Sequence, residues 1–307
     1  MVIHLVNEIP GAGTWRTMEE IQKGWSVDKK YYVEAADGRV MLLRMSDISR
    51  YDRRKLEFES VKKLDSADIL MSRPIDFGVC NQGRSVYSLF TWVEGEDARE
   101  IIPLLSMEDQ YRLGVDAGKA LRLIHEMDGE HYHSSWADYY NAKIDRYIQN
   151  YQTCGIHIEG AEEILRYIEE NRHLLEGRPM SLQHGDYHVG NMIITNTKEL
   201  GIIDFNRLDF GDPWEEFNRI TWCSEISGYF ASGRINGYFN DDVPDAFFRL
   251  MALYIACNQI GSVHWAIPFG EEQVDIMLDQ AKNVFNEYNG FRSCIPSWYG
   301  TGIIFEQ

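Results

Sequence analysis

The sequence has little of what marks exported or membrane-spanning proteins. Its first residues, MVIHLVNEIPGAG, are too short and too polar for a signal peptide with a basic start and an apolar core. The most apolar stretch, LMALYIACNQIGSVHWAI, is broken by Asn258, Gln259, Gly261 and His264. We therefore predict a buried helix there rather than a membrane span, and expect a cytoplasmic protein with no membrane partner.

Cysteine is also scarce, and repeats, low-complexity segments and long linkers are absent from the sequence. The five cysteines are widely scattered and form no CxxC pair: Cys80, Cys154, Cys223, Cys257 and Cys294. An odd number without metal-ligand spacing predicts reduced, mostly buried thiols. It argues against a zinc site or a disulfide framework.

The acidic charge that is present belongs to one part of the chain. Of the 307 residues, 1–94 carry 14 basic and 14 acidic side chains, whereas 95–307 carry 16 and 34, which accounts for the whole net charge of −18. A strongly acidic part repels nucleic acid and attracts cationic small molecules, although acidic surfaces also merely keep proteins soluble. We expect no nucleic-acid partner.

The chain is long enough for two lobes, and its texture changes near Thr91–Gly95. Before that point KKYYVEAADGRVMLLRM predicts a hairpin, RYDRRKLEFESVKKLDSA a helix, and RPIDFGVCNQGRSVYSLFTWVEG two more strands. The order strand, strand, strand, helix, strand, strand describes a small antiparallel sheet with one packed helix.

After Gly95 the patterns are helical. SMEDQYRLGVDAGKALRLIHEM begins at a Ser106 cap, and ADYYNAKIDRYIQNYQ, EGAEEILRYIEENRHLL and most of the chain after Trp214 have helical periodicity. We therefore expect an α+β protein with a lobe at 1–94 and a larger, mainly helical lobe at 95–307, meeting at a cleft.

One segment interrupts the helices: SLQHGDYHVGNMIITNTKELGIIDFNRLDFGDP, residues 181–213. It predicts a strand, a loop with Asp186 and Asn191, and a hairpin whose second strand ends at Asp204. We expect the strand ends that carry these residues to meet on one side of the hairpin. Taken singly, each of them suits a polar turn. As a spaced set, they offer oxygen ligands for Mg²⁺ beside phosphates, with one carboxylate left to accept a hydroxyl proton, as in a nucleotide-dependent phosphoryl transferase.

The pattern H-G-D-x-x-x-x-N, an apolar strand, I-D-F and G-D-P resembles the aminoglycoside phosphotransferase and choline-kinase superfamily. The resemblance implies a bilobal protein-kinase-like fold. It implies that Asp186 orients and deprotonates the acceptor hydroxyl, and that Asn191 and Asp204 hold Mg²⁺. It also implies a bracing role for Asp212, and structural or positioning roles for His184 and His188.

The same resemblance places the phosphoryl donor, ATP or GTP, against the first lobe. The residues it implies there are Gly24 and Ser26 in a phosphate-covering turn, Arg44 where most relatives carry lysine, Glu57 (or Glu59) as its helix partner, and Thr91 and Val93 within the base-binding segment 89–93. We expect Trp92 in that segment to pack in the core, with stacking on the base as the alternative. Arginine keeps the positive charge and adds a fork that clamps phosphate.

The acceptor is expected to be a small-molecule hydroxyl compound, cationic and aminoglycoside-like, which would connect the protein with antibiotic resistance. Acidic candidates for contacting it are Glu215, Glu216, Glu271, Glu272 and Asp275; an aromatic box for choline could use Trp222, Tyr229, Trp265 and Trp298. Sugar or amino-acid kinases remain alternatives. Arg44 keeps a nucleotide-binding pseudokinase open, but the complete set Asp186, Asn191 and Asp204 favours an active kinase.

Overall fold

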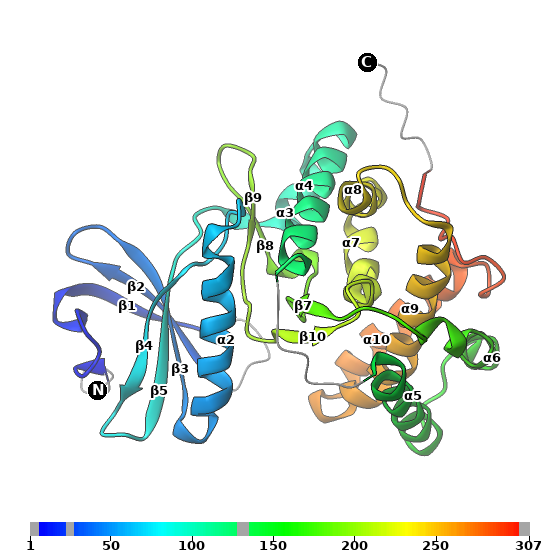
Figure 1. The fold of residues 1–307 in the computed structure, drawn as a ribbon, viewed down its shortest axis with the longest axis horizontal. Helices are drawn as coiled ribbons and strands as arrows, with labels where there is room; N and C mark the ends of the chain where they lie inside the picture. Colours follow the sequence, from blue (N-terminus) through cyan, green and yellow to red (C-terminus); the bar gives the residue numbers. More distant parts are fainter. Residues whose placement is uncertain (1–5, 23–27, 128–134, 301–307) are drawn as a thin grey trace. The chain divides into compact units, whose positions relative to one another are not determined.

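The computed structural model describes residues 6–22, 28–127 and 135–300, and its contacts divide the chain into two compact units (Figure 1). Unit 1 comprises Met1–Glu96 and Met192–Leu208, and unit 2 comprises Asp97–Asn191 and Asp209–Gln307. The division after Glu96 lies two residues beyond the expected boundary. The segment Met192–Leu208 differs more, since the sequence places it with the helical part and its contacts place it with unit 1.

The described residues of unit 1 form the predicted antiparallel sheet. Its order is β1-β2-β3-β5-β4, and the strands are β1 (Trp15–Ile21), β2 (Lys29–Ala35), β3 (Val40–Asp47), β4 (Pro74–Cys80) and β5 (Ser85–Thr91). The β2–β3 hairpin closes with a hydrogen bond from Ala35 N to Arg39 O, 2.9 Å, around the expected Asp37-Gly38 turn.

The two faces of this sheet have different chemistry because side chains alternate along each strand. One face buries Tyr31, Val33, Leu43 and Leu89 in a core with the N-terminal segment around Ile9. Against the sheet, α2 (Tyr51–Lys63) packs through aromatic contacts: the Phe58 ring lies 5.4 Å from Phe77 and 5.7 Å from Phe90. The helix predicted in this region is confirmed.

The hairpin of β8 (Met192–Ile194) and β9 (Leu200–Ile202) belongs to unit 1 for a specific reason. Ile202 donates its N–H to Leu70 O (2.8 Å) and accepts from Ser72 N (3.3 Å), which forms a parallel bridge at Met71. The chain that ends at Asp204 is therefore attached to residues of unit 1 that lie far away in sequence.

The described part of unit 2 is mainly helical, as predicted; the strand at the start of the 181–213 segment was expected, whereas the strand that pairs with it was not. After β6 (Glu96–Asp97), its described elements are α3 (Ala98–Ile101), α4 (Met107–His125), α5 (Trp136–Thr153), α6 (Ala161–Asn171), β7 (Ser181–Gln183), β10 (Asp209–Gly211), α7 (Ile220–Ile226), α8 (Gly228–Phe239), α9 (Asp245–Ala266) and α10 (Glu271–Glu287), with short 3₁₀ turns between them. Ser106 caps α4 by accepting from Asp109 N at 3.1 Å.

The apolar helix α9 is the core of unit 2. The segment Asp245–Phe269 has the length and composition of a membrane span, but 72% of its most apolar window is buried inside the protein. This confirms the predicted buried helix. All five cysteines are free thiols; Cys80, Cys223 and Cys257 are buried, and Cys154 and Cys294 are half-buried.

Two helices of unit 2 pack with their backbones in contact. A Cβ added at Gly114 or Gly118 of α4 would lie 2.2 Å from the carbonyl oxygen of Phe230 or Arg234 of α8. Gly233 and Gly237 of α8 are equally close to the carbonyls of Tyr111 and Val115. The four glycines permit this close crossing, since any side chain there would force the helices apart.

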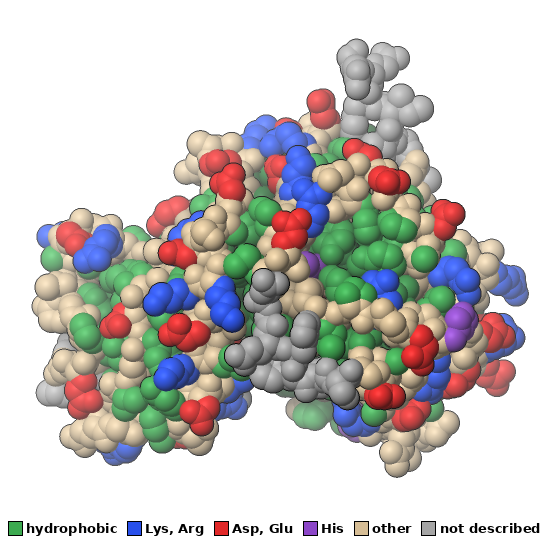
Figure 2. Space-filling view, in the orientation of Figure 1, with side chains coloured by type: hydrophobic (Ala, Val, Ile, Leu, Met, Phe, Trp, Pro, Cys, Tyr) green, Lys and Arg blue, Asp and Glu red, His purple; other side chains and the backbone are tan. Residues whose placement is uncertain are grey.

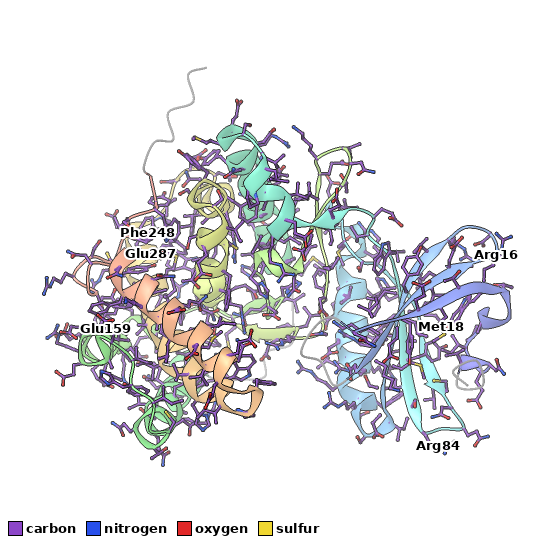
Figure 3. The ribbon with its side chains drawn as sticks, turned by 180° about the vertical axis from the view of Figure 1, so that it is seen from behind. Arg16, Met18, Arg84, Glu159, Phe248 and Glu287 are labelled. Carbon is purple, nitrogen blue, oxygen red and sulfur yellow. The ribbon has the colours of Figure 1, made fainter. Side chains whose placement is uncertain are left out.

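The stability of unit 2 should fall as pH rises because of Glu287, at the end of α10 (Figure 3). Burial, and to a lesser extent the charge of Glu225, raises the pKa of Glu287 to about 7 from 4.5, against an opposing hydrogen bond from Trp298. The folded state thus favours the protonated acid. Its contribution to stability is complete below the ordinary pKa and is lost as pH rises towards 7.

Glu287→Gln should therefore show a weaker decline of the unfolding free energy across this pH range than the wild type. Urea unfolding at several pH values measures it, with Glu170→Gln on the exposed face of α6 as the matched control. Equal pH slopes for Glu287→Gln and wild type would contradict the prediction.

Candidate active site

The loop that carries Asp186 leaves β7, which pairs antiparallel with β10. The loop is closed by its own hydrogen bonds: Asp186 N donates to His184 Nδ1 (3.3 Å), His188 N to Asp186 O (3.1 Å), and Asn191 N to His188 O (2.9 Å). Gly185 has a φ of +80°, a conformation that favours glycine. His184 is fully buried, so its contacts serve the loop's shape.

Glu216 binds the main chain of this loop. Its carboxylate accepts from His184 N (2.6 Å) and Gly185 N (2.7 Å), and it lies 3.4 Å from His125 Nε2. Although burial alone raises it, the pKa of Glu216 is held below its usual value by the hydrogen bond to His125, nearby histidine charge and the Gly185 N–H. A buried, ionised Glu216 therefore fixes the backbone beside Asp186.

Asp212 of the G-D-P sequence also braces the unit, in agreement with the role that the resemblance implies. It is fully buried and receives both arms of the Arg178 guanidinium, at 2.7 and 2.8 Å. Tyr254 OH on α9 donates to it at 2.6 Å, and Trp214 N at 3.0 Å. These contacts tie the end of β10 to the core helix.

The Asp186 carboxylate lies among cationic or potentially cationic groups. Arg219 NH1 is 3.2 Å and His188 Nε2 is 3.5 Å from Asp186 Oδ1, and the Asp186 side chain is 16% exposed. Arg219 follows the G-D-P sequence on a 3₁₀ turn, and no motif in the sequence singled it out. A partly exposed carboxylate held in this way can orient a hydroxyl group and accept its proton.

Asn191 is oriented by its own loop. Its Nδ2 donates to the Asp186 carbonyl oxygen at 2.9 Å, which settles which side of the amide carries the oxygen. The amide oxygen is then the group that can act as a hard ligand. An amide oxygen is a suitable ligand for Mg²⁺, as predicted for Asn191 from the sequence.

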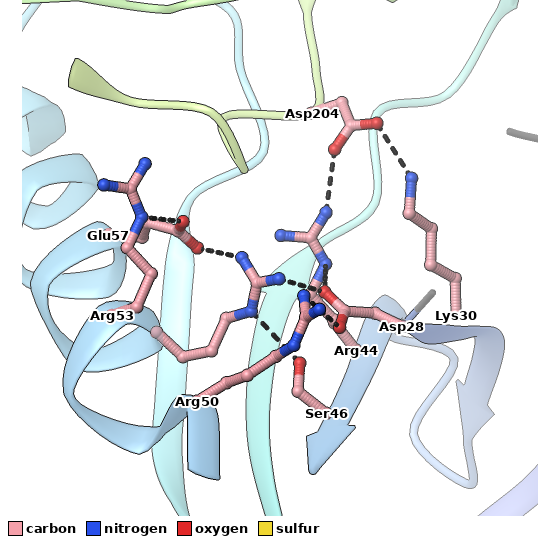
Figure 4. Close-up of polar contacts among 9 residues, drawn as sticks. Asp28, Lys30, Arg44, Ser46, Arg50, Arg53, Glu57 and Asp204 are labelled. Carbon is pink, nitrogen blue, oxygen red and sulfur yellow. Dashed lines mark hydrogen bonds and ion pairs between the residues drawn. The ribbon is translucent and has the colours of Figure 1, made fainter. Parts of the chain in front are cut away.

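In unit 1, Asp204 is held by two cations (Figure 4). Lys30 Nζ lies 2.8 Å from Asp204 Oδ2, and Arg44 NH2 lies 2.8 Å from Asp204 Oδ1. Asp204 has a φ of +66°, in the left-handed region that aspartate tolerates better than most residues. The carboxylate type also fits a Mg²⁺ ligand.

Lys30 was missed by the sequence analysis, although the β2–β3 register could have identified it. Lys30 is the cross-strand partner of Arg44, so both side chains stand on the same face of the sheet. The turn at Asp37-Gly38 determines this register. A cation in the strand opposite Arg44 was therefore readable from the hairpin.

The predicted pairing of Arg44 with Glu57 is wrong. Within the described residues Glu57 pairs with Arg53 (2.8 Å) and with Arg54, both on its own helix. Arg54 in turn binds Asp28 at 2.6 Å, and Asp28 lies 3.6 Å from Arg44 Nε. The reason is distance along the helix: arginines three and four residues before Glu57 reach it first.

In the segment predicted to bind the base, two polar groups of Thr91 are already hydrogen-bonded to Arg73. Thr91 N donates to Arg73 O, and Thr91 Oγ1 accepts from Arg73 N, both at 2.8 Å. Val93 is buried, with its side chain beside Gly201. Base binding therefore stays a prediction for the remaining backbone groups of this segment. Gly24 and Ser26 lie outside the described residues.

The acidic candidates for acceptor binding separate into two groups. Glu215 and Glu216 are buried, and Glu215 pairs with Lys143 Nζ at 3.0 Å. The expectation that these two residues are surface contacts for the acceptor is therefore wrong. Glu271, Glu272 and Asp275 are exposed at the start of α10, where acidic residues also stabilise a helix. On the face in Figure 2, acidic side chains are scattered rather than gathered into one patch.

The aromatic candidates have protein partners of their own. Trp265 packs against Phe269 with ring centroids 4.8 Å apart, and Trp298 Nε1 donates to Glu287 at 3.1 Å. Trp222 and Tyr229 are half-buried. An aromatic box therefore stays a prediction.

Comparison with protein families decides the class. The model of the phosphotransferase enzyme family, APH, matches residues 17–248. The chain belongs to this family. It is therefore a phosphotransferase that acts on a hydroxyl group of a small molecule. A separate comparison with curated protein sequences finds no match.

Solved structures of the family share the fold at low identity. A thermostable mutant of aminoglycoside phosphotransferase APH(4)-Ia, solved with ADP and hygromycin B, is 14% identical with a TM-score of 0.67; the match covers 89% of this chain and 95% of that one. APH(2")-IIa in complex with gentamicin is 17% identical with a TM-score of 0.61, covering 87% and 91%. The protein-kinase-like α+β fold is thus confirmed.

Proposed function

We propose that this phosphotransferase transfers the γ-phosphoryl group of ATP or GTP to a hydroxyl of a cationic, aminoglycoside-like molecule, with Mg²⁺. The observation that carries the proposal is the loop of unit 2, which holds the Asp186 carboxylate against Arg219 and orients the Asn191 amide. Loops of this composition serve phosphoryl transfer, where positioning and charge stabilisation do most of the work.

Each residue has a separate role in this proposal. Asp186 orients the acceptor hydroxyl and takes its proton. Asn191 and Asp204 would hold Mg²⁺, which when bound offsets the charge of the phosphates. Arg44 and Lys30 supply positive charge for the phosphates, and transfer proceeds directly, with no phosphoenzyme.

The acceptor class rests on charge and on the family. Unit 2 contains nearly all of the acidic segment 95–307, and similar structures are complexes with hygromycin B or gentamicin. An acidic surface raises the encounter rate of a cationic acceptor at low salt. The exposed carboxylates Glu271, Glu272 and Asp275 are the candidates left for direct contact.

A coupled assay for ADP and GDP release with Mg²⁺ tests the proposal, run against a panel of aminoglycosides with choline and simple sugars alongside. Release that depends on an aminoglycoside supports both the reaction and the acceptor class. Release only with choline or a sugar keeps the kinase and rejects the acceptor. Nucleotide binding without release for any acceptor would favour a nucleotide-binding pseudokinase.

A further inference from the structure

Lys30 and Arg44 form a two-cation site on one face of the unit 1 sheet. They are paired across β2 and β3, and their side chains are only 13% and 7% exposed. Both point at one carboxylate, Asp204, which engages each cation with a different oxygen (Figure 4). Two neighbouring cations that share one carboxylate have the charge and spacing of an anion site.

Among the residues that the structure describes, the well-buried charges around this site balance only when Asp204 is included. The well-buried cations are Lys30, Arg44 and Arg54, and their acidic partners are Asp28, Glu57 and Asp204. Arg50 and Arg53, which also join the network, are about half exposed and add further positive charge. Withdrawal of Asp204 would leave an excess of buried positive charge, which is costly unless another anion replaces it.

We infer that Asp204 is the internal occupant of a phosphate site made by Lys30 and Arg44, and that a nucleotide phosphate replaces it. The inference rests on the proposed function and assigns Lys30 as a second phosphate-binding residue beside Arg44. The ligand class is the phosphate chain of a nucleoside di- or triphosphate. Arg44 contributes a planar fork and Lys30 a point charge, which together suit neighbouring phosphate oxygens.

The shared carboxylate makes nucleotide and metal binding interdependent. Without metal, Asp204 competes with phosphate for the two cations. Mg²⁺ held by Asp204 would give the carboxylate another partner and would leave Lys30 and Arg44 to the phosphate. Because linkage is reciprocal, nucleotide must then favour metal binding by the same factor.

Asp204→Asn tests this by removing the competing charge at nearly constant size. ADP and GDP binding are measured by calorimetry in EDTA and again with Mg²⁺. In EDTA the variant should bind nucleoside diphosphate about tenfold more tightly than wild type, since one charge-assisted contact no longer opposes binding. Mg²⁺ should increase the nucleotide affinity of the wild type, and this increase should be largely absent from Asp204→Asn. Equal or weaker binding of the variant in EDTA would overturn the inference.

Lys30→Met provides the second test, because it removes one cation while leaving Asp204 and Arg44. Its affinity for nucleoside diphosphate should fall about tenfold or more, with and without Mg²⁺, whereas adenosine or guanosine binding should not change. Lys30→Arg should restore most of the loss. The control is Lys29→Met, one residue away on β2 and exposed. Wild-type affinity in Lys30→Met would reject Lys30 as a phosphate ligand.

The two proposals fail in different ways. If wild-type protein binds no nucleotide and transfers no phosphoryl group, the proposed function fails, and this inference fails with it. If wild type is active but Asp204→Asn and Lys30→Met show neither effect, only the inference fails. Thermal unfolding of each variant shows whether it is folded. If Asp204→Asn does not fold, the affinity of Lys30→Met for nucleoside diphosphate decides the inference.

Discussion

Replacing Asp186 with alanine should abolish turnover while MgATP still binds. Asp186 is the only residue to which the proposal gives the acceptor proton, and loss of a positioned general base lowers kcat by about 10²–10⁴-fold. The loop contacts described above, between main-chain groups and from Glu216, do not involve the Asp186 side chain, so the loop's shape should survive. Steady-state kcat from ADP or GDP release, with calorimetry for nucleotide affinity, measures both parts.

Asp279→Ala is the matched control for this variant, because Asp279 is an exposed aspartate of unit 2 on α10. It should retain wild-type kcat and affinity. Unchanged turnover in Asp186→Ala would remove the assignment of the base. Loss of nucleotide binding together with turnover would indicate that Asp186 supports the donor rather than the acceptor.

Replacing Glu216 with alanine should destabilise unit 2 and remove activity together. The change leaves the N–H groups of His184 and Gly185 without their carboxylate and leaves His125 beside an empty space. Removing one partner of a buried charged network costs about 3–5 kcal/mol. Urea unfolding measures the stability loss, and the release assay measures turnover.

The charge of Glu216 can be separated from its shape. Glu216→Gln keeps an acceptor oxygen and should lose less stability than Glu216→Ala. The pKa of Glu216 lies below its usual value, so its contribution is present above that usual value and is lost as pH falls. The glutamine variant should lack this acid-dependent loss. The control Glu170→Ala, on the exposed face of α6, should match wild type in stability and activity. A stable and active Glu216→Ala variant would contradict the bracing role of Glu216.

Much of the fold could be predicted from local patterns. The alternation in KKYYVEAADGRVMLLRM and the Ser106 cap each identify an element whose hydrogen bonds form within a few residues or across one turn. The loop that carries Asp186 and Asn191 was readable for the same reason, since its spacing sets its own backbone contacts.

Partner choice was harder to predict. Glu57 looked like the partner of Arg44, yet Arg53 and Arg54 reach it first from the same helix. Glu215 and Glu216 looked like surface charges, because acidic residues beside each other in a sequence give no sign of burial. Glu216 is buried beside the loop that follows β7, and this loop presents two N–H groups to its carboxylate.

The sequence by itself determined which chemical groups this phosphotransferase has, because Asp186, Asn191 and Asp204 stand at spacings that local strands and turns impose. Only the tertiary structure decided which groups meet. Asp204 is 174 residues from Lys30 and 160 from Arg44, and the three meet because Ile202 is hydrogen-bonded to Leu70 and Ser72 of unit 1. Contacts over such separations depend on how the whole unit packs, and no local pattern records them.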